Sequence, residues 1–146
     1  MGTYESSVWS NSRISYPASK LIDGLNLLAW GDGCAHTNNN DLNSWFSLEM
    51  DMPKIVTRVQ IADRWECCST GHSCCEKSQN VRITIGPSQA YDPSEPLCLP
   101  EIAQLVQQAG LQDYPCTVLH EGKFVKISRS GVLNMCEIKI FALQGK

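Results

Sequence analysis

Short runs in which apolar and polar residues alternate recur along most of this 146-residue chain. Alternation places every second side chain on one face of a strand, so each run predicts a half-buried β-strand. Residues 51–53 end in a proline and are expected to separate the first two strands. Many short strands with turn residues between them predict an all-β sandwich. The expected strands cover residues 45–50, 56–61, 81–85, 117–119, 124–127 and 136–143.

Two stretches follow a helical pattern instead. Residues 17–24 begin with a proline and end on Gly24, which predicts a short turn of helix. Residues 99–110 have a proline near their start and a glycine at their end, and they predict a second helix. The apolar residues at helical spacing in that second segment are Ile102, Leu105, Val106 and Ala109.

Residues 25–43 show little periodicity of either kind. Long irregular segments in compact domains usually carry function or hold an ion. The chain length fits one domain, residues 1–146, and no internal repeat is visible.

The charge balance argues against two classes of partner. The chain has 12 Lys and Arg against 15 Asp and Glu, so it offers no basic stripe for nucleic acid or an anionic membrane. No apolar run approaches the roughly 20 residues that span a bilayer, which predicts no membrane insertion. The first residues lack the apolar core of a secretory signal, so we expect a secreted protein to have lost its signal peptide.

Eight cysteines indicate the compartment. They are even in number and lack the repeated Cys-x-x-Cys spacing of a structural zinc site, so disulfides in a secreted, extracellular protein are favoured. One alternative is a zinc or redox protein that uses His72 and the cysteines around it, which free-thiol counting and metal analysis would decide. Those cysteines are Cys67, Cys68, Cys74 and Cys75.

Two of the disulfides can be considered from loop length. A bond between Cys34 and Cys136 would close a long loop, worth about 4.7 kcal/mol in the chain-entropy model. A bond between Cys98 and Cys116 would close the shorter loop around the predicted second helix, worth roughly 3 kcal/mol. Sequence alone does not fix the connectivity.

The four clustered cysteines leave two pairings open. Cross-pairing of Cys67 with Cys75 and of Cys68 with Cys74 would make a small clip. Vicinal pairing would join neighbours whose Cα atoms lie about 3.8 Å apart, below the roughly 4.4 Å lower edge of ordinary disulfides. A vicinal bond would therefore stabilise little, and its expected use is a rigid, weakly polar contact surface.

Several short motifs together resemble the F-type lectin (fucolectin) family. The resemblance extends from about residue 15 to residue 141 and rests on the order and spacing of the motifs. It implies a jelly-roll β-sandwich with short helical segments, a fucose site on loops at one end, and a bound calcium ion. The motifs are Asp23-Gly24, Cys34-Ala35-His36-Thr37, Trp45-Phe46, the run from Val59 to Cys68, Val81-Arg82-Ile83 and Cys136-Glu137-Ile138.

The resemblance also implies the sugar-binding residues. His36 and Arg64 fit the family's histidine and first arginine, and Glu66 stands where the family usually has Asp. Cys67-Cys68 match the family's vicinal disulfide. The family's second cation follows its cysteine pair, and here residues 69–75 contain an insertion that moves this role to Lys77, with His72 as the alternative.

These residue types suit a deoxy-sugar. The guanidinium fork of Arg64 can donate two parallel hydrogen bonds to adjacent hydroxyl oxygens, and Lys77 adds a compact charge. A neutral His36 has one donor and one acceptor nitrogen, so it can read a hydroxyl group. Trp30 is expected to form a wall for the sugar's methyl group.

The calcium site implied by the resemblance lies on the irregular segment. Its side-chain ligands are Asp23 and Glu137, which are hard oxygen donors of the kind that Ca2+ prefers. We expect the ion to be structural and to support His36. Backbone carbonyls are expected from Lys20, the turn at Asn26, Gly33 and Cys136.

The sequence therefore predicts a secreted, calcium-containing, non-catalytic lectin for L-fucose and fucosylated glycans, with a role in cell recognition. No nucleophile–base pair or carboxylate dyad occurs in a motif, so no enzyme is proposed. Weak binding at one site per chain leads us to expect a homo-oligomer for avidity. The alternative is a discoidin-like adhesion module that binds protein or phospholipid through apolar loop tips.

Overall fold

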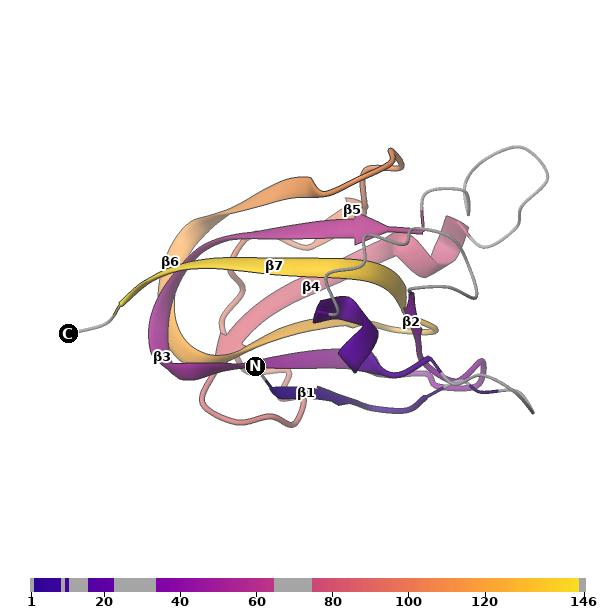
Figure 1. Ribbon diagram of the computed structural model, residues 1–146, viewed down its shortest axis with the longest axis horizontal. Helices are drawn as coiled ribbons and strands as arrows, with labels where there is room; N and C mark the ends of the chain where they lie inside the picture. The colour runs from indigo at the N-terminus through magenta and orange to yellow at the C-terminus, as the bar shows by residue number, and fades with distance from the viewer. Residues whose placement is uncertain (1, 9, 11–15, 23–33, 65–74, 145–146) are drawn as a thin grey trace.

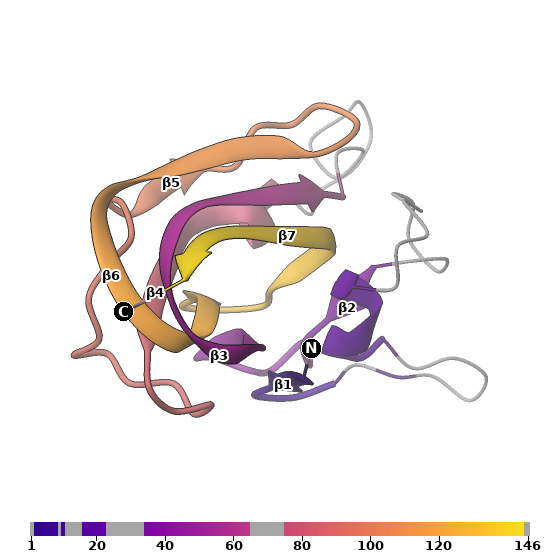
Figure 2. The ribbon, with the colours of Figure 1, turned by 60° about the vertical axis from the view of Figure 1, so that its left-hand side comes forward.

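Two layers of antiparallel strands face each other across an apolar core in the computed structural model (Figures 1 and 2). The structure describes residues 2–8, 10, 16–22, 34–64 and 75–144. The predicted all-β jelly-roll sandwich is confirmed. In the described part of the chain, no helix has the length and hydropathy of a membrane span.

Two long strands, β3 (Ser44–Asp63) and β6 (Gln112–Arg129), belong to both layers. The first half of β3 pairs with β1 (Gly2–Glu5) and with the second half of β6. The second half of β3 pairs with the first half of β6 and with β7 (Asn134–Gln144). Both strands therefore bend around one side of the molecule, as Figure 2 shows.

Shorter strands complete the layers. β4 (Gln79–Gly86) pairs with the second half of β6, and β5 (Ile102–Gln104) pairs with β4 at the edge. β2 (Ala35–His36) pairs with the start of β7 in the other layer. The predicted strands at residues 81–85 and 136–143 are confirmed as β4 and β7, whereas β1 and β2 were not predicted.

The predicted break at residues 51–53 is wrong, because β3 continues through it. The ladder between β3 and β6 is interrupted between Glu49 and Lys54, so Pro53 lies at the bend. A proline has no N–H to donate, and at an interrupted ladder none is needed. The expected strands 117–119 and 124–127 are likewise one strand.

Gly122 allows β6 to make the corresponding bend. A Cβ atom at this position would lie 2.8 Å from Ile85 Cγ2 and 2.9 Å from the carbonyl oxygen of Gly86. Only glycine lets β6 approach β4 this closely.

The predicted helix at residues 99–110 is also wrong. Ile102 lies in β5 opposite Val81, and Leu105 is fully buried in the core. Val106 is 41% exposed, so the apolar residues do not share one helical face. The apolar residues of this segment are spaced as in a helix, but the segment instead forms a strand that pairs with the open edge of β4.

The short helix near the start of the chain is confirmed. It is the 3-10 helix η1 (Ala18–Ile22), whose Ala18 and Leu21 are buried. Pro17 precedes it, and its carbonyl accepts a 3.1 Å hydrogen bond from the backbone N–H of Lys20.

Disulfides join Cys34 to Cys136 and Cys98 to Cys116. The first ties the residue before β2 to β7, and the second ties the segment after β4 to β6. Cys67, Cys68 and Cys74 lie outside the described residues, as does the side chain of Cys75. Their pairing therefore stays a prediction.

Candidate binding site

Four elements meet at one end of the sandwich, on the right in Figure 1. They are β2, the end of β3, the start of β7 and the 3-10 helix η3 (Cys75–Ser78), which leads into β4. β2 pairs with β7 at Asn134 and Met135, and β7 pairs with the end of β3 at Asp63. This arrangement places three predicted sugar-binding residues at the same end: His36, Arg64 and Lys77.

His36 is held firmly and is only 2% exposed. Its backbone N–H donates to the carbonyl of Tyr16 at 2.9 Å, and its Nδ1 lies within hydrogen-bond distance of the carbonyl of Thr37. A carbonyl only accepts, so Nδ1 carries the ring proton. The lone pair of Nε2 is then directed toward Lys77, whose Nζ donates to it at 3.2 Å.

Burial lowers the pKa of His36 to about 4, and the positive charges of Lys77 and Arg64 act in the same direction. The hydrogen bond to Thr37 opposes this shift without reversing it. Burial and the charge of Arg64 also lower the pKa of Lys77, partly offset by Glu76. At neutral pH the cluster therefore consists of a neutral imidazole beside two cations.

Asp63, the last residue of β3 and the one before Arg64, connects β3 to the helix that carries Lys77. This carboxylate is buried, and its Oδ2 accepts hydrogen bonds from the hydroxyl of Ser78 and from Nε2 of Gln107. Sequence reasoning missed Asp63. It continues the alternation of Val59 and Ile61, so its position already indicates an inward-facing carboxylate that needs partners.

Thr37 secures the strand that carries His36. Its hydroxyl accepts a 2.9 Å hydrogen bond from the backbone N–H of Leu133 and lies 2.8 Å from Oγ of Ser44. The side chain of Asn134 donates to the carbonyl of Ala35 at 2.7 Å. These bonds fix β2 against β7 and so fix the position of the imidazole.

Several predicted sugar contacts cannot be placed. The sugar-binding predictions at Trp30, Glu66, Cys67 and Cys68 fall outside the described residues, and so does the alternative cation His72.

The predicted calcium ligands are placed in part. Lys20 lies in η1, which packs against β7, where Cys136 and Glu137 follow each other. Glu137 is 3% exposed, and a buried carboxylate of this kind suits a cation. A cavity of about 460 Å³ is lined by Ile22 of η1 and by Glu137 and its neighbours on β7. Glu137 and the backbone carbonyls are oxygen donors of the kind that Ca2+ prefers, while Asp23, Asn26 and Gly33 lie outside the described residues, so the calcium site stays a prediction.

The described residues hold no group of three or more His, Cys, Asp or Glu side chains placed to bind a metal. A calcium site here would therefore draw on backbone carbonyls as well as Glu137. The zinc alternative rests on His72 and its neighbouring cysteines, which the description does not cover.

Comparison with known proteins gives one sequence relative and several similar structures. No family model matches the chain. Fucolectin-1 of Anguilla japonica is 26% identical over 113 residues, which cover 75% of this chain and 58% of the relative. A serum fucolectin of the striped bass, Morone saxatilis, is 25% identical with a TM-score of 0.79, over 97% of this chain and 46% of that one. The chain thus spans about half the length of these two relatives.

A third solved structure is similar to this chain in fold. The lectin domain of lectinolysin, solved in complex with Lewis B antigen, has a TM-score of 0.72 at 17% identity. The alignment covers 99% of this chain and 92% of that domain. The whole described sandwich, including η1 and the long bent strands, therefore matches one complete domain of that protein.

Proposed function

We propose that this chain, which is similar to the fucolectins of eel and striped bass, is a non-catalytic F-type lectin that binds L-fucose and fucosylated glycans. The observation that carries the proposal is the cluster of His36, Lys77 and Arg64 at one end of the sandwich. The fucolectins of eel and striped bass and the Lewis B complex of lectinolysin support the ligand class.

The cluster can recognise a sugar hydroxyl from both sides. A hydroxyl donates its proton to Nε2 of His36 and accepts hydrogen bonds from Lys77 and Arg64 on its oxygen. In this scheme the sugar takes over the bond that Lys77 now makes to His36. Hydrogen bonds to charged donors contribute about 1.5–3 kcal/mol each, which supports roughly micromolar to millimolar binding of a monosaccharide.

We infer that calcium supports this site. Glu137, the carbonyls of Lys20 and Cys136, and Asp23, Asn26 and Gly33 would hold the ion. It would supply a structural tie between η1 and β7. Because Cys136 is disulfide-bonded to Cys34, which precedes β2, that tie would reach His36.

We further propose that the protein is secreted and acts as a homo-oligomer. Two disulfides favour an oxidising compartment. One weak site per chain gains useful avidity when several copies are joined.

A second candidate function is adhesion to protein or phospholipid, and one observation favours it. Leu42 is 74% exposed in the loop between β2 and β3, at the same end as His36. A glycan array and vesicles of phosphatidylserine separate the two functions, because fucose recognition predicts selective glycan binding and no vesicle binding.

The fucose proposal is tested by retention on fucose-agarose. We expect Arg64→Ala to abolish retention and to leave the far-UV circular dichroism spectrum unchanged. Arg58→Ala is the matched control, since this half-exposed arginine of β3 lies six residues before Arg64 and contacts Asp113 and the ring of Phe141 instead. Retention of Arg64→Ala at the level of Arg58→Ala would overturn the proposed site.

A further inference from the structure

A cavity of about 360 Å³ opens on the outer face of the layer formed by β4 and the second half of β6. Arg82 of β4 lies opposite Ser128 of β6, and both residues line the cavity. The next residues of these strands, Ile83 and Ile127, point into the core. Since side chains alternate along a strand, Arg82 and Ser128 face outward.

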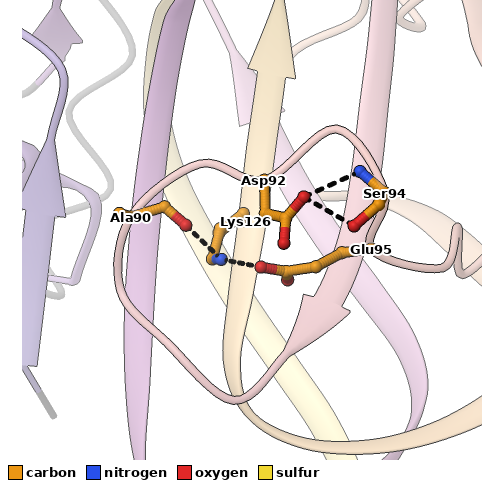
Figure 3. A network of polar contacts seen from close by, with 5 residues as sticks. All are labelled: Ala90, Asp92, Ser94, Glu95 and Lys126. Atoms are coloured by element: carbon orange, nitrogen blue, oxygen red, sulfur yellow. Dashed lines mark hydrogen bonds and ion pairs between the residues drawn. The ribbon is translucent and has the colours of Figure 1, made fainter.

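One wall of the cavity is a loop pinned down by a buried ion pair (Figure 3). Lys126, fully buried on β6, pairs with the carboxylate of Glu95 and donates to the carbonyl of Ala90. Asp92 accepts hydrogen bonds from the N–H and hydroxyl of Ser94 at 2.9 and 2.6 Å. These contacts hold the loop between β4 and β5, so Tyr91, which lines the cavity, has a fixed support.

The charge lining the cavity is positive. Its charged residues are Arg82, Arg129 and Glu101. Nη1 of Arg82 lies 3.9 Å from Oε1 of Glu101, beyond hydrogen-bond distance. The guanidinium of Arg129 donates to two backbone carbonyls, those of Gln79 and Val132, and the carboxylate that acts on its charge, Glu76, is not part of the cavity lining.

Two polar atoms that line the cavity are free to bond a ligand. Nε of Arg82 and Oγ of Ser128 are buried and have no hydrogen-bond partner among the described residues. Ser128 as a whole is 3% exposed. Buried polar groups left without partners destabilise the unliganded protein, so a ligand that supplies oxygen atoms here is bound more favourably.

We propose that this cavity is a second carbohydrate site, which binds an acidic sugar through a sulfate ester or a carboxylate. Planar guanidinium groups pair well with both oxyanions, and the ring of Tyr91 offers an apolar face to the sugar. Its volume falls within the range of about 300–1,000 Å³ for small-molecule pockets. The overall charge of the chain is −3, so this positive cavity is a local feature.

The position of the cavity places it beside the proposed fucose site. Asn80 lines it, three residues after Lys77, and Arg129 donates to the carbonyl of Gln79 at 2.9 Å between them. The choice of a sugar as the ligand rests on the proposed lectin function. The two sites share no residue, so each can be tested alone.

Calorimetric titration of the full chain with four probes tests the proposal: galactose 6-sulfate, N-acetylneuraminic acid, galactose and sodium sulfate. We expect at least one acidic sugar to bind, and to bind more tightly than both galactose and inorganic sulfate. The bound acidic sugar identifies the oxyanion. Failure of both acidic sugars, or equal affinity for galactose or for inorganic sulfate, would overturn the proposal.

Charge variants assign the binding to the cavity. Arg82→Gln removes one charged donor and is expected to lower the affinity for the acidic sugar roughly ten- to hundredfold. Glu101→Gln removes the negative charge of the lining and is expected to raise the affinity for the acidic sugar. Arg58→Gln is the matched control and should leave the affinity unchanged, since Arg58 also has a carboxylate neighbour, at 3.8 Å, but lies outside the cavity lining. Equal affinities for Arg82→Gln and Arg58→Gln would contradict the assignment.

Fucose-agarose retention keeps the two proposals distinguishable. We expect Arg82→Gln to be retained like the parent protein, and Arg64→Ala to lose retention while it still binds the acidic sugar. Loss of acidic-sugar binding in Arg64→Ala, with an unchanged melting temperature, would show that the cavity is not an independent site.

Discussion

His36 stays neutral in a positively charged neighbourhood because ionising it would be costly. Burial removes the water that stabilises an imidazolium, and Lys77 and Arg64 repel a third positive charge. The neutral ring keeps one lone pair on Nε2, which Lys77 contacts. This single atom gives the site a hydrogen-bond acceptor among donors.

The low pKa of His36 predicts how stability depends on pH. The unfolded chain binds a proton at this residue near pH 6.5, whereas the folded chain does so only near pH 4. The free energy of unfolding should therefore be constant above about pH 6.5 and fall as the pH drops toward 4, by about 2 kcal/mol at pH 5. Urea denaturation between pH 5 and 7.5 measures this slope.

His36→Gln is the control for that slope, because it removes the titrating ring while the carboxylates remain. A slope that is the same in the variant and in the parent protein would show that His36 does not carry the effect.

Asp63 is predicted to position the site without touching the sugar. Asp63→Ala leaves the hydroxyl of Ser78 without this acceptor, at about 1–3 kcal/mol, and leaves Nε2 of Gln107 with its hydrogen bond to the carbonyl of Leu105. We expect lower stability and weaker fucose binding, since the variant loses the bond between the end of β3, next to Arg64, and the helix of Lys77. Asp63→Asn, which keeps one acceptor oxygen, should recover part of both. Fucose titration and urea denaturation measure the two effects, and fucose binding unchanged by Asp63→Ala would contradict the positioning role.

At the scale of elements, the sequence predicted strands well where one face is buried and one is not. Residues 81–85 alternate cleanly because β4 has a core face and an outer face. The prediction failed where a strand passes from one layer to the other, as β3 does at Pro53 and β6 does at Gly122. Proline and glycine usually end strands, and here they mark bends within them.

The loop between β4 and β5 should depend on the buried ion pair of Lys126 and Glu95. Lys126→Met leaves the glutamate buried without its partner, and such losses cost about 3–5 kcal/mol. Replacing both residues, as Lys126→Met with Glu95→Gln, should cost much less. Guanidinium denaturation measures both variants.

Lys123→Met is the matched control for the ion pair, because Lys123 pairs with Glu49 on the surface at 2.9 Å. We expect only a small change there. A loss of stability in Lys126→Met no larger than in this control would show that the buried pair does not hold the loop.

For the molecule as a whole, the sequence located the conspicuous charged residues but not the contacts between distant segments. His36, Arg64 and Lys77 could be named because the family motif fixes their order, and the structure brings them to one end. The acidic-sugar cavity could not be predicted, since Arg82, Tyr91 and Arg129 meet only after two strands and a loop assemble. A local sequence pattern does not show which distant segments come into contact.

Calcium is predicted to contribute to the stability of the whole sandwich. If the ion holds η1 against β7 through Lys20 and Glu137, EDTA should lower the melting temperature, and added Ca2+ should restore it. Glu137→Gln should lower the melting temperature and abolish the response to EDTA. Scanning calorimetry checks this, and a parent protein whose melting temperature EDTA leaves unchanged would rule out a stabilising calcium site.

The most direct test of the central claim is a crystal of the protein soaked in L-fucose. The account predicts one fucose bound with a hydroxyl within hydrogen-bond distance of Nε2 of His36, and with Arg64 and Lys77 donating to its oxygens. Fucose bound elsewhere, or crystals that remain without sugar at saturating concentration while this end of the sandwich is open to solvent, would contradict it.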